Sequence, residues 1–152
     1  MRISKTKKVM DWFDAKAAAR LSGLTFDMIN YLCRHELVSP SVGSKRGRGS
    51  RRRYSYADIL LLRVIAKLLL NGISPLRLRN SLKSLHGRDV EAKGILTTRY
   101  VVTDGYNIYF QDEGVVELLD SGQMTFAFVL ELTKLRDEVT ANIESELKIA
   151  SA

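Results

Sequence analysis

Residues 55–70, SYADILLLRVIAKLLL, place apolar side chains on nearly every side of a predicted helix. Ser55 and Asp58 match a capping box in which Asp replaces the more usual Glu. At the other end, Asn71-Gly72 provides a residue that can adopt left-handed backbone. A helix that is apolar all round has to be covered by other elements. We therefore expect residues 59–70 to form the central helix of the core.

Two shorter helices are predicted before this central helix. Asp14 has the character of an N-cap for residues 15–21, and Thr25 can cap a second helix that runs to about residue 34. The tripeptide Ser22-Gly23-Leu24 is expected to form the tight turn between them. The side chains that the second helix should bury are Ile29, Leu32 and Cys33. Helix, glycine-containing turn and helix in this order are typical of a helix-turn-helix unit.

A basic segment separates these helices from the central helix. Six of the nine residues 45–53 are Lys or Arg, and none is acidic. Glycines within the segment allow turns, and residues 51–54 are expected to form a returning strand of a two-stranded wing. A solvated loop is the alternative, but the position between two structured elements favours a phosphate-binding wing. About six phosphate contacts would give a log-log salt slope of about −5.

The pattern changes after the central helix. Ser74 and Pro75 open a further helix whose expected apolar side consists of Leu76, Leu78, Leu82 and Leu85. Residues 100–103 and 106–110 are predicted strands, joined by a two-residue hairpin at Asp104-Gly105. A short helix is expected at 115–119, closed near Gly122.

A long helix is predicted over residues 125–149. Its apolar positions recur at steps of three and four, which indicates a continuous stripe that needs a partner surface. The expected stripe consists of Val129, Leu132, Leu135, Val139, Ile143 and Leu147. The fold class is therefore mainly α with small β elements. A winged helix-turn-helix domain is expected over residues 1–93, followed by an acidic hairpin-plus-helix region over residues 94–152.

Charge is distributed unevenly along the chain. Residues 1–103 carry a net charge of +14 and residues 104–152 a net charge of −7. The basic part favours a polyanion as partner, whereas the acidic part favours dimerisation, sensing or a protein partner. The aromatic residues after residue 100 are interpreted as the core of a small hairpin-plus-helix unit, with a ligand pocket or a partner surface as alternatives.

Other functional classes have little support in the sequence. Arg63 and Lys67 interrupt the longest apolar run and the N-terminus is polar, so we expect a cytoplasmic, nucleoid-associated protein without a membrane segment. Cys33 is the single cysteine, and no Cys/His group has zinc spacing, so neither a disulfide nor a metal or other cofactor is expected. His35 and His86 are isolated, and no nucleophile or acid/base pattern is present, so no enzyme is expected.

The short motifs AAARLSG, LVSP, RRYS and NGISPLRLR follow one another in this order. Together they resemble the winged helix-turn-helix domain of MerR-type transcriptional regulators over about residues 13–85. The resemblance implies that the second helix enters the major groove and that the wing and an Arg-Tyr pair hold flanking phosphates. It also implies that a long C-terminal helix pairs two subunits across a palindrome.

The resemblance and the pattern of exposed side chains together define the expected sites. Asn30 and Leu32 stand where the family often has Arg and Tyr, and Asn30 can instead read an adenine through its amide. The expected DNA contacts are Lys16, Arg20, Thr25, Phe26, Asn30, Tyr31, Arg34, Lys45, Arg46, Arg48, Arg51, Arg52, Arg53 and Tyr54. The expected dimerisation residues are Leu132, Leu135, Val139, Ile143 and Leu147.

The favoured function is a sequence-specific regulator that binds double-stranded DNA as a homodimer on a palindromic operator. An antitoxin-like or adaptor protein is the alternative, in which the acidic part binds a partner protein while the basic part binds DNA. A recombination directionality factor would share the winged domain, and no sequence feature separates it from the regulator.

Overall fold

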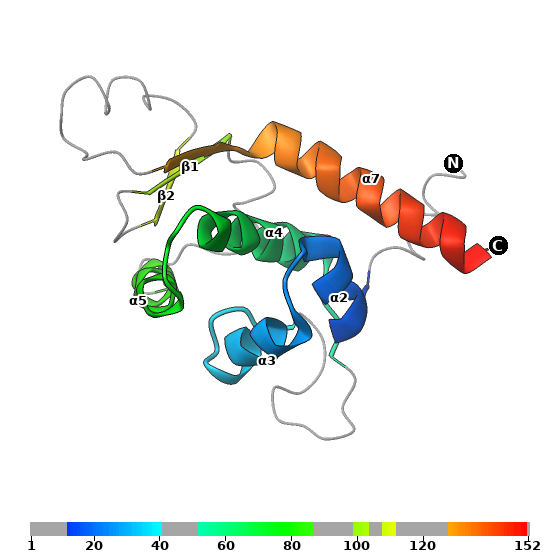
Figure 1. The fold of residues 1–152 in the computed structure, drawn as a ribbon, viewed down its shortest axis with the longest axis horizontal. Coiled ribbons are helices and arrows are strands. Elements are labelled where there is room, and N and C mark those ends of the chain that lie inside the picture. Colours follow the sequence, from blue (N-terminus) through cyan, green and yellow to red (C-terminus); the bar gives the residue numbers. More distant parts are fainter. Residues whose placement is uncertain (1–11, 41–51, 87–98, 104–107, 112–127, 152) are drawn as a thin grey trace.

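The structure of the chain, a computed structural model, describes residues 12–40, 52–86, 99–103, 108–111 and 128–151 (Figure 1). The predicted fold class, mainly α with small β elements, is confirmed. In chain order the elements are α2 (Ala15–Ser22), α3 (Phe26–Arg34), α4 (Tyr56–Leu70), α5 (Pro75–His86), β1 (Tyr100–Thr103), β2 (Ile108–Gln111), β3 (Phe128–Glu131) and α7 (Leu132–Ser151). Residues 41–51 of the basic segment and the predicted helix at 115–119 lie outside the described residues.

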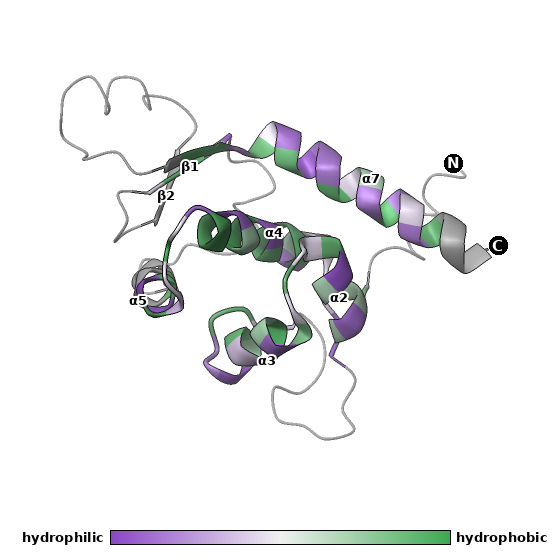
Figure 2. Ribbon diagram, in the orientation of Figure 1, coloured by the Kyte–Doolittle hydropathy of each residue, from purple (hydrophilic) through white to green (hydrophobic). Residues whose placement is uncertain are grey.

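Helix α4 lies at the centre of the fold, and α2, α5 and α7 pack against it (Figure 1). It is apolar along most of its length (Figure 2). The predicted capping box is present, because the Asp58 N–H donates to Ser55 Oγ at 3.2 Å and the Ser55 N–H donates to Asp58 Oδ2 at 3.0 Å. The buried apolar side chains of this confirmed core helix are Ile59, Leu60, Leu62, Val64, Ile65, Ala66 and Leu68.

Helices α2 and α3 form the predicted helix-turn-helix unit. The Ala17 N–H donates to Asp14 Oδ1 at 2.8 Å, and the Met28 N–H donates to Thr25 Oγ1 at 3.1 Å, so both predicted N-caps are confirmed. Gly23 ends α2 with a φ of 83°, in the left-handed region that glycine adopts without strain. The side chains predicted to be buried on α3 are buried.

The side chain of Arg63 leaves the apolar surface of α4 and joins two neighbouring elements. Its Nη1 donates to the Ser22 carbonyl at the end of α2 at 3.0 Å, and its Nη2 pairs with the Glu138 carboxylate of α7. Lys67 lies 3.9 Å from the same carboxylate. Only 16% of the Arg63 side chain is exposed, so water competes weakly for these partners. One guanidinium thus holds both the turn before α3 and the helix α7.

Helix α7 lies along α4 and α2, on the side of the fold away from α3 (Figure 1). Four of the five residues predicted to form a dimer interface are buried in the core of the same chain, and they are Leu132, Leu135, Val139 and Ile143. Leu147 is partly exposed. Pairing of two copies through this stripe stays a prediction, and it would require α7 to leave α4. The described parts of the two predicted regions share one core.

Strand β1 is the middle strand of a three-stranded antiparallel sheet with the order β2-β1-β3. The start of the predicted long helix was wrong, because residues 128–131 form β3 and Val101 pairs with Leu130. Phe and Val favour strands, and pairing with β1 gives the backbone groups of this segment hydrogen-bond partners. These two effects outweigh the helical spacing of the apolar residues.

The connection between β1 and β2 also differs from the prediction. Thr103 pairs with Ile108, so four residues join the strands instead of the two predicted at Asp104-Gly105. A two-residue connection would set Asn107 opposite the buried Val102, whereas the observed register sets Tyr109 there. The register of the strand pair therefore outweighs the local preference of the turn.

Helix α5 begins where the sequence predicted, because the Arg77 N–H donates to Ser74 Oγ at 3.2 Å. Leu78 and Leu82 are buried, as expected. The assignment of Leu76 to the apolar side was wrong, since 63% of this residue is exposed. Two positions along an α-helix correspond to a rotation of about 200°, so Leu76 points away from the side that Leu78 buries.

Replacement of Gly23 by Ala is expected to destabilise the fold more than replacement of Gly72 by Ala. Both glycines have positive φ, so each substitution introduces backbone strain of about 1–2 kcal/mol. A Cβ atom at Gly23 would lie 2.6 Å from Arg63 Nη1, whereas nothing lies within 4 Å of one at Gly72. Gly23→Ala must therefore also displace Arg63 from Ser22. Denaturant unfolding measures both losses, and equal losses would contradict the role assigned to Arg63.

Glu138→Gln is expected to lower the free energy of unfolding by about 1–2 kcal/mol, because it removes the charge that faces Arg63 and Lys67. Glu144 is exposed on the same helix and provides the matched control. Glu144→Gln should change the free energy of unfolding by less than about 0.5 kcal/mol. Thermal or denaturant unfolding of both variants gives the comparison, and equal stability of the two would rule out a significant contribution from the ion pair.

Candidate nucleic-acid interface

A short antiparallel bridge brings the start of α2 next to the segment that follows the basic run. The Phe13 N–H donates to the Tyr54 carbonyl at 2.9 Å, and the Tyr54 N–H donates to the Phe13 carbonyl at 2.7 Å. The residues that precede this pair, Trp12 and Arg53, are both exposed. The bridge therefore holds the cationic side chain of Arg53 close to the first turn of α2.

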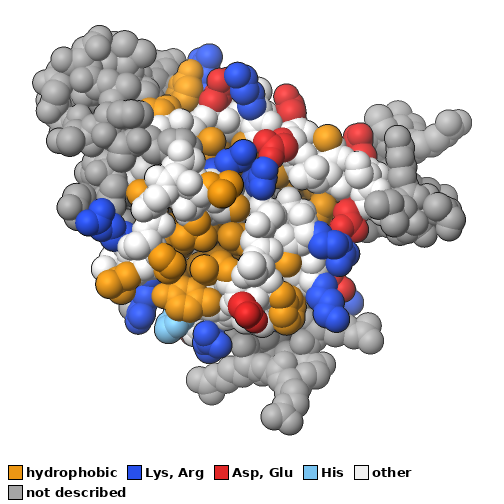
Figure 3. All heavy atoms as spheres, viewed as in Figure 1, with side chains coloured by type: hydrophobic (Ala, Val, Ile, Leu, Met, Phe, Trp, Pro, Cys, Tyr) orange, Lys and Arg blue, Asp and Glu red, His pale blue; other side chains and the backbone are white. Residues whose placement is uncertain are grey.

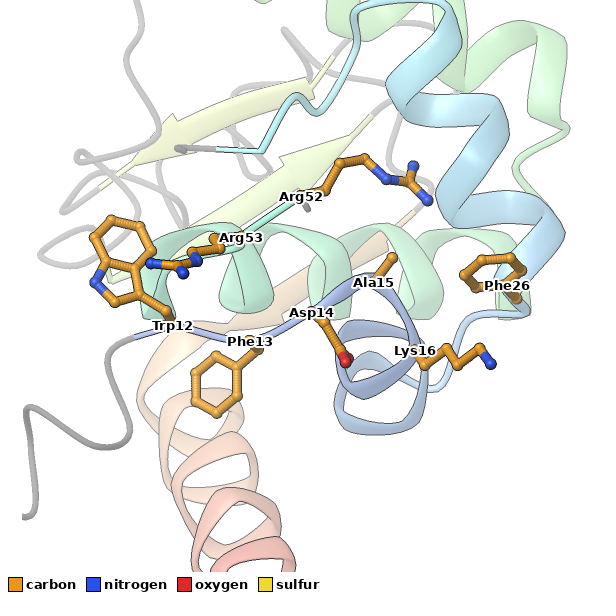
Figure 4. Close-up of a pocket in the computed structure, with 8 residues that line it drawn as sticks. All are labelled: Trp12, Phe13, Asp14, Ala15, Lys16, Phe26, Arg52 and Arg53. Carbon is orange, nitrogen blue, oxygen red and sulfur yellow. The ribbon is translucent and has the colours of Figure 1, made fainter. Parts of the chain in front are cut away.

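The bridge, the first turn of α2 and the start of α3 border an open hollow of about 600 Å³ (Figure 4). Trp12 and Arg53 project on one side of it, and Lys16 and Phe26 on the other (Figure 4). Trp12 is 43% exposed and Phe26 is 41% exposed. The residues that line the hollow are Trp12, Phe13, Asp14, Ala15, Lys16, Phe26, Arg52 and Arg53. Cations beside exposed aromatic rings suit a partner with phosphate groups and flat apolar surfaces, as in a nucleic acid.

The side chain of Arg52 fastens this segment to α3. Its Nη2 donates to Asn30 Oδ1 at 2.7 Å, and its Cζ lies 6.0 Å from the centroid of the Phe26 ring. Phe26, Asn30 and Arg34 follow one another at intervals of four residues, so they share one face of α3. The exposed face of α3 and the residues after the basic run therefore form one continuous surface.

The other predicted contacts on α3 are placed as follows. Thr25 and Arg34 are exposed at the two ends of the helix. Tyr31 is half-buried, and its ring packs against His35 with ring centroids 4.5 Å apart. Four predicted wing contacts lie outside the described residues, and they are Lys45, Arg46, Arg48 and Arg51.

Arg20 does not belong to this surface. Its Nε donates to Glu146 Oε1 at 2.6 Å and its Nη2 donates to Glu146 Oε2 at 3.3 Å, on the side of α2 that packs against α7. The hydrogen bond from Arg20 to the carboxylate raises the pKa of Arg20. Arg20 is thus paired with a carboxylate of α7 while 58% of its side chain stays exposed, and its auxiliary phosphate contact stays a prediction.

The structure also corrects the predicted phosphate contact of Tyr54. The residue is fully buried in the core, so its hydroxyl group cannot reach a phosphate in this conformation. Burial raises the pKa of Tyr54 to about 12. Strand alternation explains the difference, because neighbouring residues of an extended segment point to opposite sides. With Tyr54 directed into the core, Arg53 is directed outward.

Trp12, Phe13 and Asp14 line the hollow but were not among the predicted contacts. The aromatic pair that directly precedes the N-cap of α2 was a usable signal in the sequence. Its proximity to residues 52 and 53 rests on a pairing between segments 41 residues apart, which no local pattern indicates.

Acidic and basic side chains lie next to each other along α7, where Glu138 and Glu146 pair with cations of α4 and α2. On the face shown in Figure 3, most of the acidic side chains lie along α7, and hydrophobic side chains reach the surface toward α3 and α5. Within the described ranges, no three His, Cys, Asp or Glu side chains are placed to hold a metal ion together. No helix among the described residues is both long and apolar enough to span a membrane.

Tyr54→Phe is expected to make the fold less sensitive to alkaline pH. The pKa of Tyr54 rises from 10.0 to about 12 on folding, so its contribution is fully present below about pH 10 and is lost as the pH rises toward 12. Between about pH 10 and pH 12 the free energy of unfolding should fall by about 2–3 kcal/mol more in the wild-type protein than in Tyr54→Phe. Denaturant midpoints of both proteins at about pH 9 and pH 11.5 give the comparison. An equal loss of stability in both proteins would mean that Tyr54 ionises as easily in the folded protein as in the unfolded chain.

Comparison with known proteins agrees with the geometry. Residues 13–85 match the family model described as MerR HTH family regulatory protein. Uncharacterized HTH-type transcriptional regulators of Mycobacterium bovis and Mycobacterium tuberculosis are 35% identical to the chain over 116 residues. The aligned region covers 75% of this chain and 50% of each relative, so the chain spans about half the length of the curated relatives it matches.

The matched residues contain both helices of the helix-turn-helix unit, the Phe13–Tyr54 bridge, α4 and most of α5. The resemblance found in the short sequence motifs is confirmed over the same range. Residues 13–85 therefore form a helix-turn-helix unit of the kind that the MerR family of regulatory proteins has.

Proposed function

We propose that the chain is a non-enzymatic transcriptional regulator that binds double-stranded DNA with sequence specificity. The observation that carries this proposal is the contact of Arg52 with both Asn30 and Phe26. It combines the exposed face of α3 with the residues after the basic run into a surface that has hydrogen-bond donors, cations and apolar groups. Major-groove recognition uses these three kinds of group on one helix and its flanks.

In the proposed mechanism α3 enters the major groove and the cations at its flank hold the DNA backbone. Thr25, Phe26 and Asn30 face the bases, while Lys16 and Arg53 beside the hollow bind flanking phosphates (Figure 4). Phosphate contacts fix the register of the protein and contribute most of the salt dependence, whereas base contacts select the sequence. Such a regulator acts at the nucleoid in the cytoplasm.

The position of α7 supports docking of DNA on the α3 side. Glu138 and Glu146 face cations of α2 and α4 on the opposite side of the fold (Figure 1). A carboxylate repels a phosphate, so these two groups disfavour docking of a polyanion on the α7 side. They therefore add to the preference for binding through α3.

A homodimer on an inverted repeat is the assembly that we propose. Helix-turn-helix proteins commonly bind two half-sites about one helical turn apart, and a two-fold axis relates the two subunits. In the present packing Leu132, Leu135, Val139 and Ile143 of α7 are buried in the core of the same chain. A dimer that keeps this packing must therefore use another surface. A protein partner for the acidic part is the second candidate, and the net charge of −7 over residues 104–152 favours it.

Selection of bound fragments from random double-stranded DNA, followed by size measurement of the complex, tests the proposal. Recovery of an inverted repeat bound by two chains would establish the dimeric regulator. Salt-sensitive binding without a preferred sequence would contradict sequence-specific regulation. A stable complex with one chain per site would exclude the homodimer.

Arg53→Ala is expected to weaken binding to all DNA sequences and to reduce the magnitude of the log-log salt slope by about 1, because one phosphate contact is lost. Lys16→Ala should act in the same direction. Lys134, which is exposed on α7, provides the control, and Lys134→Ala should leave the slope unchanged. Binding titrations at several salt concentrations measure these slopes. Equal slopes for Arg53→Ala and Lys134→Ala would exclude Arg53 from the phosphate contacts.

A further inference from the structure

Resting on the proposed DNA-binding function, we propose that Arg52 and Asn30 act as one unit that reads a guanine. Within this unit Arg52 also prevents Asn30 from reading an adenine. The sequence alone suggested the opposite, because an isolated Asn on a recognition helix pairs well with adenine. The difference arises from a contact between residues 22 positions apart.

The contact uses the oxygen of the Asn30 side chain. Arg52 Nη2 donates to Asn30 Oδ1 at 2.7 Å. A guanidinium has no acceptor atom, so the amide oxygen of Asn30 must face Arg52 and the amide nitrogen must point elsewhere. Both residues are half-buried at the exposed face of α3, where the Phe26 ring lies beside the guanidinium at 6.0 Å. The hydrogen bond and the nearby ring together favour this position of Arg52, so Asn30 is oriented before DNA binds.

Adenine recognition needs the atom that Arg52 occupies. The amide of Asn reads adenine by accepting from the N6 amino group through Oδ1 while it donates to N7 through Nδ2. Although an amide oxygen has a second lone pair, an amino group that approached Asn30 Oδ1 would meet the donors and the positive charge of Arg52. Two donors placed against each other repel, so adenine is disfavoured at this position.

Guanine suits the same pair. Asn30 retains only the donors of Nδ2, and Arg52 carries further N–H donors beside them. In the major groove guanine presents two neighbouring acceptors, O6 and N7, whereas adenine and thymine each present an acceptor next to a donor or a methyl group. A surface made only of donors therefore selects guanine.

The test compares base preference in the wild-type protein and in three variants. Each base pair of a DNA site selected by the wild-type protein is changed in turn to the other three, and dissociation constants are measured. The wild-type protein should prefer guanine over adenine by about tenfold at one position. Arg52→Ala frees Asn30 Oδ1, so its preference at that position should move to adenine. The double variant Arg52→Ala/Asn30→Ala should lack the preference for adenine that Arg52→Ala acquires.

Arg53→Ala is the matched control, because it removes a neighbouring cation that makes no contact with Asn30 in the described structure. It should weaken binding without a change in the preferred base. Thermal unfolding of each variant verifies that it is folded. Suppose that the wild-type protein binds a preferred site, but that Arg52→Ala does not move the preferred base from guanine to adenine at any position of that site. The inference is then overturned while the proposed function stands. If the wild-type protein has no preferred site, both are overturned.

Discussion

The contacts of Arg63 determine how the helix-turn-helix unit is held against the rest of the protein. A charged side chain in a helix as apolar as α4 is costly unless its donors find partners. Arg63 Nη1 and Nη2 find them in the Ser22 carbonyl and the Glu138 carboxylate, whereas its buried Nε has no hydrogen-bond partner among the described residues. The carbonyl groups in the last turn of a helix lack partners within that helix, so Arg63 satisfies a group that α2 leaves open. Only Gly23 and Leu24 separate Ser22 from Thr25, the N-cap of α3, so the orientation of α3 depends on this guanidinium.

A series of contacts connects helix α7 with the proposed DNA-binding face. Helix α7 packs on α4, Arg63 joins α4 to the turn, and the turn leads into α3. Arg52 then fastens the residues after the basic segment to α3. Each step is a packed helix surface, a hydrogen bond or the continuous chain. A ligand or protein that moved α7 would act on α3 through the same contacts.

The sequence predicted best those features that depend on neighbouring residues. Both N-caps and the capping box arise within three residues, and the burial of α4 follows from its composition. Features that depend on distant residues were missed or placed wrongly. Residues 128–131 carry a helical pattern, yet pairing with β1 turns them into a strand. The bridge of Phe13 with Tyr54 and the contact of Arg52 with Asn30 have no local signature, so the hollow and the orientation of Asn30 could not be predicted.

The burial of the α7 stripe against α4 has a consequence for the order of events during synthesis. Residues 13–85 leave the ribosome before α7 does, and until α7 follows, the α4 surface that Leu132, Leu135 and Val139 cover stays in contact with water. Arg63 likewise lacks its carboxylate partner during this interval. The nascent helix-turn-helix unit is thus incomplete until α7 has left the ribosome. Its final packing forms only when α7 packs against α4. Until then the uncovered apolar face of α4 is a surface of the kind that chaperones bind.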